Sequence, residues 1–502
     1  MKKFNKICIL LLFTTFISIL SGCSVDNRKG QYAQNDYSYD NDESYNYPST
    51  ENNEGYLEIT ENEFVKTSED PVSTFSLDTS TAGYANLRRL ISRGSSISKN
   101  QVKIEEMVNY FNYDYVSPTG DNALAISSEI MNCPWNSNNK IVSIGIKAKD
   151  IEKSNVKNNL VFLLDVSGSM DDPAKLGLMQ SAFKLFVETL NEDDTVSIVT
   201  YAGSDKVVLD GGKGYEKKRI VNLIEDLTAG GSTAGADGIR TAYRLAEKYF
   251  VEDGNNRVIL GTDGDFNVGI SSIQDLKEFI SDKRKTNVYL SVLGFGYGNL
   301  KDDTLSTLAG SGNGNYAYID SLNEARKVLV EEIGGTLNIV SKDTKTQVTF
   351  NPAYVVKYRL LGYENKLLTD EEFNDENADA GEIGAGHVVT AVYEIEVNAN
   401  SSTPSTMDSN WLKVLIRHKD PTSGANKEIE RFINESSIKT TPSEDIQFIS
   451  AVIEFGLILR VSPHKADASF SGIITRLDKL NCVKDDLYKK EFLELVKKKA
   501  NL

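Results

Sequence analysis

The sequence predicts an α/β protein with a doubly wound, mainly parallel sheet, flanked by a β-rich module that ends in helices. Three observations predict this fold class. Buried strand patterns alternate with helical patterns between residues 156 and 336, period-two strand patterns stand on both sides of that region, and helical patterns close the chain. A chain of 502 residues also exceeds what one hydrophobic core usually serves, so we expect several folded regions.

The amino terminus has the pattern of an export signal. Lys2, Lys3 and Lys6 are followed by an apolar run at residues 7–20. That run is too short to span a bilayer as a helix, and no later segment is long and apolar enough to do so. We therefore expect a protein that is exported and then loses its signal.

Residues 20–23 read Leu-Ser-Gly-Cys, which resembles the cleavage motif of bacterial lipoproteins. That resemblance implies a signal peptide at 1–22 and acyl chains on Cys23. Two or more acyl chains hold a protein stably in a bilayer, whereas one chain binds only marginally. We therefore expect attachment to the cell membrane, on its extracytoplasmic face.

Residues 23–70 are predicted to form an acidic, disordered tether. The stretch at 31–48 consists mainly of Asn, Asp, Ser and Tyr, with almost no aliphatic residues. Such a composition buries too little apolar surface to offset the entropy of ordering. Its tyrosines leave a second interpretation open, a tract that binds the cell wall.

Folded sequence is expected to begin near Pro71, with an N-terminal flanking segment at 71–155. Its first half has helical spacing and its second half alternates between apolar and polar residues. The expected helices cover 85–92 and 103–110, and the expected strands cover 124–131 and 140–148.

The central region, residues 156–336, is predicted to be the doubly wound α/β domain. Residues 160–164 form an unbroken apolar run, as expected of a strand that is buried on both faces of a parallel sheet. Pro173 is then well placed to open a helix. The further expected strands are 196–201, 258–260, 288–293 and 316–319, and the expected helices are 173–190, 216–226, 236–249, 272–283 and 322–333.

The C-terminal region, residues 337–502, is predicted to be β-rich and then helical. The expected strands are 347–350, 355–361, 387–397 and 411–417, and the helical stretches are 445–459 and 470–499. Isolated strands just before the α/β domain suggest a further hypothesis. The strands before residue 150 and those after 345 would pair into one module, with the α/β domain inserted between them.

Three polar sequences are expected on loops at one edge of the predicted sheet. Asp165, Ser167 and Ser169 follow the first buried strand, Thr233 precedes a helix in a Gly-Gly-Ser-Thr sequence, and Asp263 ends a later strand. The carboxyl edge of a parallel sheet is where open α/β sheets bind ligands. We therefore expect these side chains to converge, although Ser232 is adjacent to Thr233 and could supply the hydroxyl instead.

This set resembles the metal-ion-dependent adhesion site of von Willebrand factor type A domains, whose pattern is Asp-x-Ser-x-Ser, then Thr, then Asp. The resemblance implies a metal held by Asp165, Ser167, Ser169, Thr233 and Asp263. More narrowly, the chain from residue 71 resembles a bacterial lipoprotein family in which this domain lies between an N-terminal segment and a β-rich C-terminal module. The stretches that carry this second resemblance are 76–84, 382–387 and 462–467.

The expected metal is Mg²⁺, with Mn²⁺ or Ca²⁺ as alternatives. Magnesium prefers octahedral oxygen ligands and retains some waters. Three hydroxyls and two carboxylates supply oxygen while adding little negative charge, so the ion stays electrophilic. The resemblance implies that an acidic side chain of a protein partner completes the coordination.

Composition and motif searches argue against other classes of function. The net charge of −17 disfavours nucleic acid, because phosphate binding needs clustered Lys and Arg. The sequence has no nucleophile elbow or Walker loop, and His387, His418 and His464 lack metal or nucleophile spacing. After signal removal Cys133 and Cys482 are the two cysteines besides Cys23, and they form either one disulfide or two thiols.

The sequence therefore predicts a surface lipoprotein that binds a protein partner through a divalent metal and is not an enzyme. Adhesion and complex assembly are both compatible with this site. The alternative is a membrane-proximal scaffold in which the metal only stabilises the loops. A hydrolase, the third class, lacks a candidate nucleophile.

Overall fold

The computed structural model describes residues 53–77, 79–151, 156–232, 235–264, 273–376, 378, 380–398, 409–439 and 441–501. The predicted signal peptide, Cys23 and the part of the tether up to residue 52 lie outside these ranges. Contacts group Thr50–Leu502 into one compact unit. No helix within the described ranges combines the length and apolarity needed to cross a membrane.

The central sheet has six strands in the order β10-β9-β8-β5-β6-β7. Five of them run parallel, and β7 is antiparallel to β6 at the edge. Chain order reverses beside β5, which places the first strand in the middle of the sheet. The strands are β5 (Asn158–Asp165), β6 (Thr195–Tyr201), β7 (Asp205–Lys213), β8 (Asn255–Thr262), β9 (Val288–Phe295) and β10 (Tyr316–Ile319).

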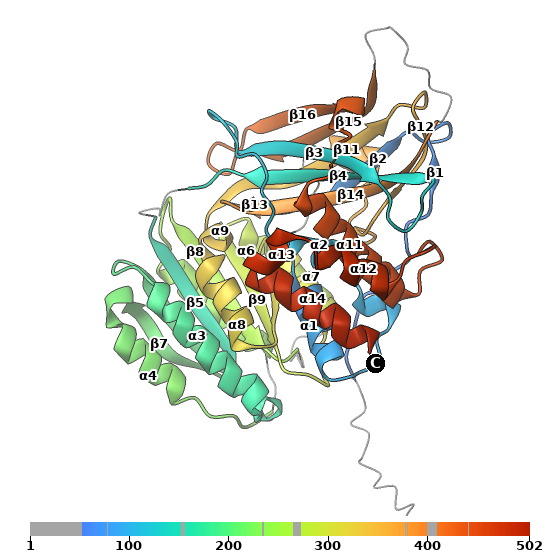
Figure 1. The fold of residues 1–502 in the computed structure, drawn as a ribbon. Helices are drawn as coiled ribbons and strands as arrows, with labels where there is room; N and C mark the ends of the chain where they lie inside the picture. The colour runs from blue at the N-terminus through green and yellow to red at the C-terminus, as the bar shows by residue number, and fades with distance from the viewer. Residues whose placement is uncertain are drawn as a thin grey trace, which may run out of the picture. The chain divides into compact units, whose positions relative to one another are not determined.

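Helices cover both faces of this sheet because its strands are apolar on both sides. In β5, Leu160, Phe162 and Leu164 face one core, and Val161 and Leu163 face the other. Figure 1 shows α3 and α8 on one face. The helices of that face are α3 (Leu178–Thr189), α4 (Lys217–Glu225), α8 (Leu322–Arg326) and α9 (Ile333–Leu337), and those of the other are α5 (Gly235–Lys248), α6 (Ile273–Arg284) and α7 (Asp302–Ser311). The predicted α/β fold class is confirmed.

The remaining strands form two further sheets. One has the order β1-β12-β14-β4-β3, and in the other β13, β11, β15 and β16 follow one another while β2 also pairs with β11. Their bounds are β1 (Val65–Lys66), β2 (Val72–Ser76), β3 (Leu124–Asn132), β4 (Asn139–Ala148), β11 (Ile339–Phe350), β12 (Val355–Leu360), β13 (Gly381–Gly384), β14 (Val388–Val397), β15 (Asn410–Lys419) and β16 (Asn426–Asn434). The two sheets share one apolar core, as in a β-sandwich.

Strands from before and after the α/β region pair directly in this module. β4 pairs with β14 from Asn139 opposite Glu396 to Lys147 opposite Val388, and β2 pairs with β11. The hypothesis that the flanks form one module around an inserted α/β domain is therefore confirmed. Period-two alternation predicted β4 and β14, whereas β2 was not expected from the sequence.

A third core joins the β-sandwich to a helical layer. It contains Ile141 of β4 and Val392 of β14 together with apolar residues of the flanking helices. These helices are α1 (Ala82–Ser92), α2 (Ile104–Asn109), α11 (Glu444–Arg460), α12 (Phe470–Leu477), α13 (Asn481–Asp485) and α14 (Leu487–Ala500). Helix α1 belongs to two cores, because Ala82 and Ala85 face the α/β domain.

The structure differs from the sequence-based expectations at several places. Residues 53–70 were expected in the tether, but Ile59 is buried and β1 pairs with β12. Val65 of this segment also packs against the core of the β-sandwich, although the segment is acidic as a whole. The strands β2, β7, β13 and β16 and the helix α7 were not expected, and the stretch 470–499 divides into three helices.

Candidate functional site

Asp165 is the last residue of β5, and its side chain is completely buried. Oδ1 of Asp165 accepts two hydrogen bonds from Ser167, one from the backbone N–H at 2.9 Å and one from the side-chain hydroxyl at 2.6 Å. Its Oδ2 accepts bonds from the hydroxyls of Tyr201 at 3.0 Å and Thr262 at 2.9 Å. All four donors are neutral, so they orient the carboxylate without cancelling its charge.

The pKa of Asp165 reflects the lack of a positive charge among its hydrogen-bond donors. Burial raises the pKa of its carboxyl to about 6, and the hydrogen bonds from Ser167 oppose that rise. The negative charge of Asp263 raises the pKa further. Asp165 is therefore a buried acid whose hydrogen-bond donors are neutral, and a nearby cation would stabilise its charged form.

Ser167 and Ser169 lie on the loop that follows β5. The Ser167 side chain is buried and the Ser169 side chain is half-buried, and their hydroxyl oxygens are 3.1 Å apart. The loop is short because Asp172 caps the next helical turn, where its side chain accepts a bond from the N–H of Ala174 and Pro173 follows it. Two neutral hydroxyl oxygens are thus held in the loop that directly follows Asp165.

The second predicted loop is joined to the first by two backbone hydrogen bonds. The N–H of Gly168 donates to the carbonyl of Gly231 at 3.0 Å, and the N–H of Gly230 donates to the carbonyl of Val166 at 2.8 Å. Thr233 lies outside the described residues, so its role stays a prediction. The described part of its loop does run beside the Asp-x-Ser-x-Ser segment.

Asp263 follows β8 on the third loop and is also completely buried. Its Oδ2 accepts hydrogen bonds from Nζ of Lys175 and from Nδ2 of Asn299, both at 2.9 Å. Lys175 also donates to Oδ1 of Asn299 at 2.9 Å. Sequence reasoning missed Lys175 and Asn299, since neither belongs to a pattern that points to a metal.

The donor set fits a hard divalent cation. Two buried carboxylates and neighbouring hydroxyls supply oxygen atoms, which Mg²⁺ and Ca²⁺ prefer. Within the described residues, no group of three or more His, Cys, Asp or Glu side chains is arranged to hold a metal. A metal centre in this part of the chain would therefore depend on hydroxyl ligands as much as on carboxylates.

Comparison with known proteins shows which family this chain is related to. An Escherichia coli (strain K12) protein described as "Uncharacterized protein YfbK" is 37% identical over 464 residues, covering 88% of this chain and 80% of that protein. The chain belongs to the YfbK family. The family model "Uncharacterized protein YfbK, C-terminal" matches residues 335–502, "von Willebrand factor type A domain" matches 159–331, and "von Willebrand factor" matches 50–143.

Two further proteins are similar to part of this YfbK-family chain. The uncharacterized protein sll0103 of Synechocystis sp. is 31% identical over 185 residues, covering 37% of this chain and 42% of that protein. The solved structure of a von Willebrand factor type A protein from Catenulispora acidiphila is 16% identical and has a TM-score of 0.42, covering 77% of this chain and 91% of that one. All five predicted metal-binding residues, Thr233 included, lie within the residues that match the von Willebrand factor type A domain.

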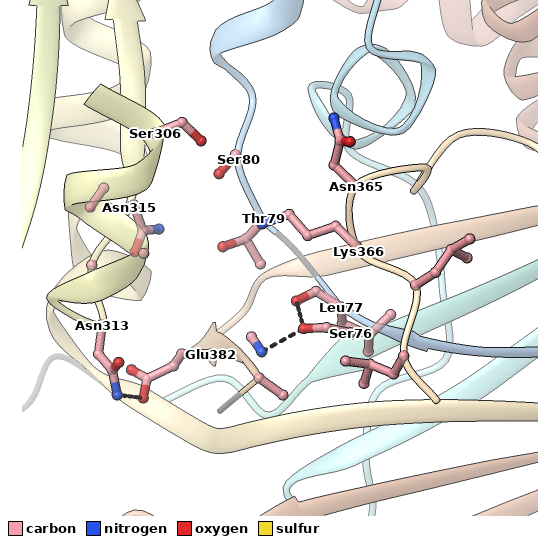
Figure 2. A pocket seen from close by; sticks show the side chains of 17 residues that line it. Ser76, Leu77, Thr79, Ser80, Ser306, Asn313, Asn315, Asn365, Lys366 and Glu382 are labelled. Carbon is pink, nitrogen blue, oxygen red and sulfur yellow. Dashed lines mark hydrogen bonds between the residues drawn. The ribbon is translucent and has the colours of Figure 1, made fainter. Parts of the chain in front are cut away.

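The YfbK-family chain also has a polar hollow of about 280 Å³, which Figure 2 shows. Side chains of α7, such as Ser306, lie on one side of it, and Ser76 and Glu382 lie on the other. Glu382 accepts a hydrogen bond from Asn313 at 2.7 Å. The other labelled side chains that line the hollow mainly carry hydroxyl or amide groups. None of the predicted metal-binding residues lines it.

Proposed function

We propose that this chain is a lipid-anchored protein of the cell surface that binds a divalent metal ion and uses it to bind a protein partner. Asp165, Ser167, Ser169, Thr233 and Asp263 would hold the ion, with Mg²⁺ expected and Mn²⁺ or Ca²⁺ as alternatives. Acyl chains on Cys23 would attach the chain to the outer face of the membrane.

One observation carries the metal proposal. Asp165 is wholly buried, and its hydrogen-bond donors among the described residues are N–H and O–H groups without charge. A buried carboxylate without a charged partner destabilises the folded state. Removing the partner of a buried ion pair lowers the free energy of unfolding by roughly 3–5 kcal/mol. A divalent cation held by Asp165 would supply this missing charge.

The residues of the site suit binding of an acidic partner better than catalysis. A bound ion supplies a Lewis-acidic position for a carboxylate of the partner. Ser167 and Ser169 are neutral, so they leave part of that positive charge available. Tyr201 and Thr262 hold Asp165 in place through its second oxygen.

The scaffold alternative, in which the metal only stabilises the loops, is less favoured. The first two loops are already joined by the bonds from Gly168 to Gly231 and from Gly230 to Val166. Thr262 joins the third loop to Asp165. Because hydrogen bonds within the chain already hold the loops together, the ion is not needed for that purpose. It can therefore bind a group of the partner.

Calorimetric titration of the full chain with Mg²⁺ and Mn²⁺ tests the metal site. Asp165→Asn keeps a hydrogen-bond acceptor at that position and removes the charge, so we expect at least a tenfold loss of affinity with unchanged circular dichroism. Asp193→Asn is the matched control, because its exposed carboxylate lies elsewhere. Absence of uptake of either ion by the unmodified chain would refute the proposal.

Partner capture from a surface extract, with and without EDTA, tests the second half of the proposal. We expect capture by the unmodified chain and by Asp193→Asn, and loss of capture with EDTA or Asp165→Asn. If Asp165→Asn loses the native fold instead, the scaffold alternative is favoured.

A further inference from the structure

Lys103, Glu106 and Asp302 form a buried cluster between the N-terminal flank and the α/β domain. Lys103 directly precedes α2, Glu106 lies within that helix, and Asp302 is the first residue of α7. Nζ of Lys103 lies 2.7 Å from Oδ2 of Asp302 and 3.2 Å from Oε1 of Glu106. All three side chains are less than a tenth exposed, so the cluster is largely shielded from bulk water.

The Glu106 carboxylate is held in place by the start of α1. Its Oε2 accepts a hydrogen bond from the backbone N–H of Gly83 at 2.6 Å, while its Oε1 contacts Lys103. Glycine permits this close approach, because a Cβ at position 83 would lie 2.9 Å from Oε2 of Glu106 and 3.2 Å from Cβ of Lys103. Gly83 belongs to the stretch 76–84, to which the proposed metal site assigns no role.

The cluster places one positive and two negative charges in the interior. Burial lowers the pKa of the Lys103 ammonium, but the charges of Asp302 and Glu106 more than offset this effect, so the pKa lies above its ordinary value and the amine starts as an ammonium. The attraction between buried charges repays the cost of removing them from water only when their remaining lone pairs are also satisfied. Oδ1 of Asp302 has no hydrogen-bond partner among the described residues. A neutral amide would remove the charges of Lys103 and Asp302 and one of the two carboxylate oxygens.

We propose that Lys103 and Asp302 join in an intramolecular amide bond, with Glu106 as the proton carrier. A bond forms between Nζ of Lys103 and Cγ of Asp302, one Cγ–O bond breaks, and one water molecule leaves. Glu106 first takes a proton from the ammonium, which makes Nζ nucleophilic, and passes it to the carboxylate of Asp302. After the attack it takes a second proton from Nζ, passes it to the departing oxygen and ends as a carboxylate. The reaction consumes no oxidant or other reactant.

The fold supplies what this condensation lacks in water. Contact between the amine and the carboxylate makes the reaction intramolecular, which lowers its entropic cost. Burial keeps water from the product and so opposes hydrolysis. A bond between residues so far apart in the sequence restricts the unfolded chain and ties the flank covalently to the α/β domain. The cluster contains none of the proposed metal ligands, so its test does not depend on the metal proposal.

Peptide mass spectrometry of the full chain after trypsin digestion tests the bond. Trypsin does not cleave after an acylated lysine, so residues 100–140 should appear joined to 302–326, at the sum of the two masses less one water molecule. A chain without the bond would give 100–103, 104–140 and 302–326 as separate peptides. Recovery of only the separate peptides from the folded, unmodified chain would overturn the proposal.

Variants separate the amide from an ordinary ion pair. Lys103→Arg keeps the positive charge but lacks the primary amine, so it should give no joined peptide. Glu106→Gln keeps the size of the side chain and removes the proton carrier, so the yield of joined peptide should fall at least about tenfold. Glu225→Gln, at a surface pair with Lys184, is the matched control and should leave the yield unchanged.

An equal yield from Glu106→Gln and the unmodified chain would overturn the role of Glu106. Circular dichroism of each variant shows whether it folds. The digest of the unmodified chain decides whether the bond exists even if a variant does not fold.

Discussion

Nζ of Lys175 lies 2.9 Å from Oδ2 of Asp263, so a lysine already occupies one oxygen of a predicted metal ligand. The Asp263 side chain is fully buried and the Lys175 side chain is 11% exposed. Asn299 bonds to the same oxygen and to the lysine. A metal bound by Asp263 must therefore share this carboxylate with an ammonium group.

Lys175→Met is expected to raise the affinity for Mg²⁺ by about tenfold, because the ion no longer shares Asp263 with a like charge. The same change should lower the free energy of unfolding in EDTA by about 3 kcal/mol, since Asp263 loses its charged partner. Calorimetry measures the first effect and urea denaturation the second. Lys184→Met is the control, because the Lys184 and Glu225 side chains that form this pair are 34% and 51% exposed. Unchanged affinity would show that Lys175 does not compete with the ion.

Glu105 makes the stability depend on pH. Burial, with the charges of Glu364 and Glu106, raises the pKa of its carboxyl to about 7, above an ordinary value of 4.5. The folded chain then binds the proton more tightly than the unfolded chain. The contribution of Glu105 to the free energy of unfolding is therefore full below pH 4.5 and falls by roughly 3 kcal/mol as the pH rises to 7.

Glu105→Gln should remove this dependence, because glutamine stays neutral. We expect the variant to be more stable than the unmodified chain at pH 8 and similar to it at pH 4.5. Urea denaturation at both pH values measures the difference. Glu252→Gln, at an exposed position, should follow the unmodified chain. A Glu105→Gln variant that is less stable at pH 8 would contradict the assigned direction.

Arg88 connects helix α1 to the α/β domain through buried charges. Its guanidinium contacts Asp320 at 2.5 Å and Glu324 at 2.7 Å, and the side chains of all three residues are less than a tenth exposed. Arg88→Met would leave two buried carboxylates without this partner, so we expect a loss of about 3–5 kcal/mol in the free energy of unfolding. Denaturation measures the loss, and Arg219→Met, which removes an exposed arginine from a surface pair with Glu216, should change the free energy of unfolding little. A small effect at Arg88 would mean that solvent reaches these carboxylates.

The N-terminal flank should not fold alone. In the fragment 53–151, β4 lacks its partner β14, and α1 and α2 lack the helices α11 and α14 that complete their core. We expect circular dichroism of this fragment to show no cooperative thermal transition. The fragment 156–336 retains both faces of its own sheet and should unfold cooperatively, below the Tm of the full chain. A sigmoidal transition in 53–151 would show that the β-sandwich needs only one flank.

Local patterns predicted the α/β domain because its strands are unbroken apolar runs, as in β5. They also placed both carboxylates at the same edge of the sheet, because Asp165 ends β5 and Asp263 directly follows the neighbouring parallel strand β8. The edge strand β7 was missed because its exposed residues break the apolar pattern. The packing of Ile59 was missed because its acidic surroundings have the composition of a tether.

The sequence by itself determined the fold class and the oxygen donors of the candidate site, because burial on both faces of a strand and a polar loop at its end are properties of neighbouring residues. Only the tertiary structure decided that β4 pairs with β14 and that Lys175 reaches Asp263. These relationships join segments that are distant along the chain. They depend on how complementary surfaces pack, and no local periodicity encodes that.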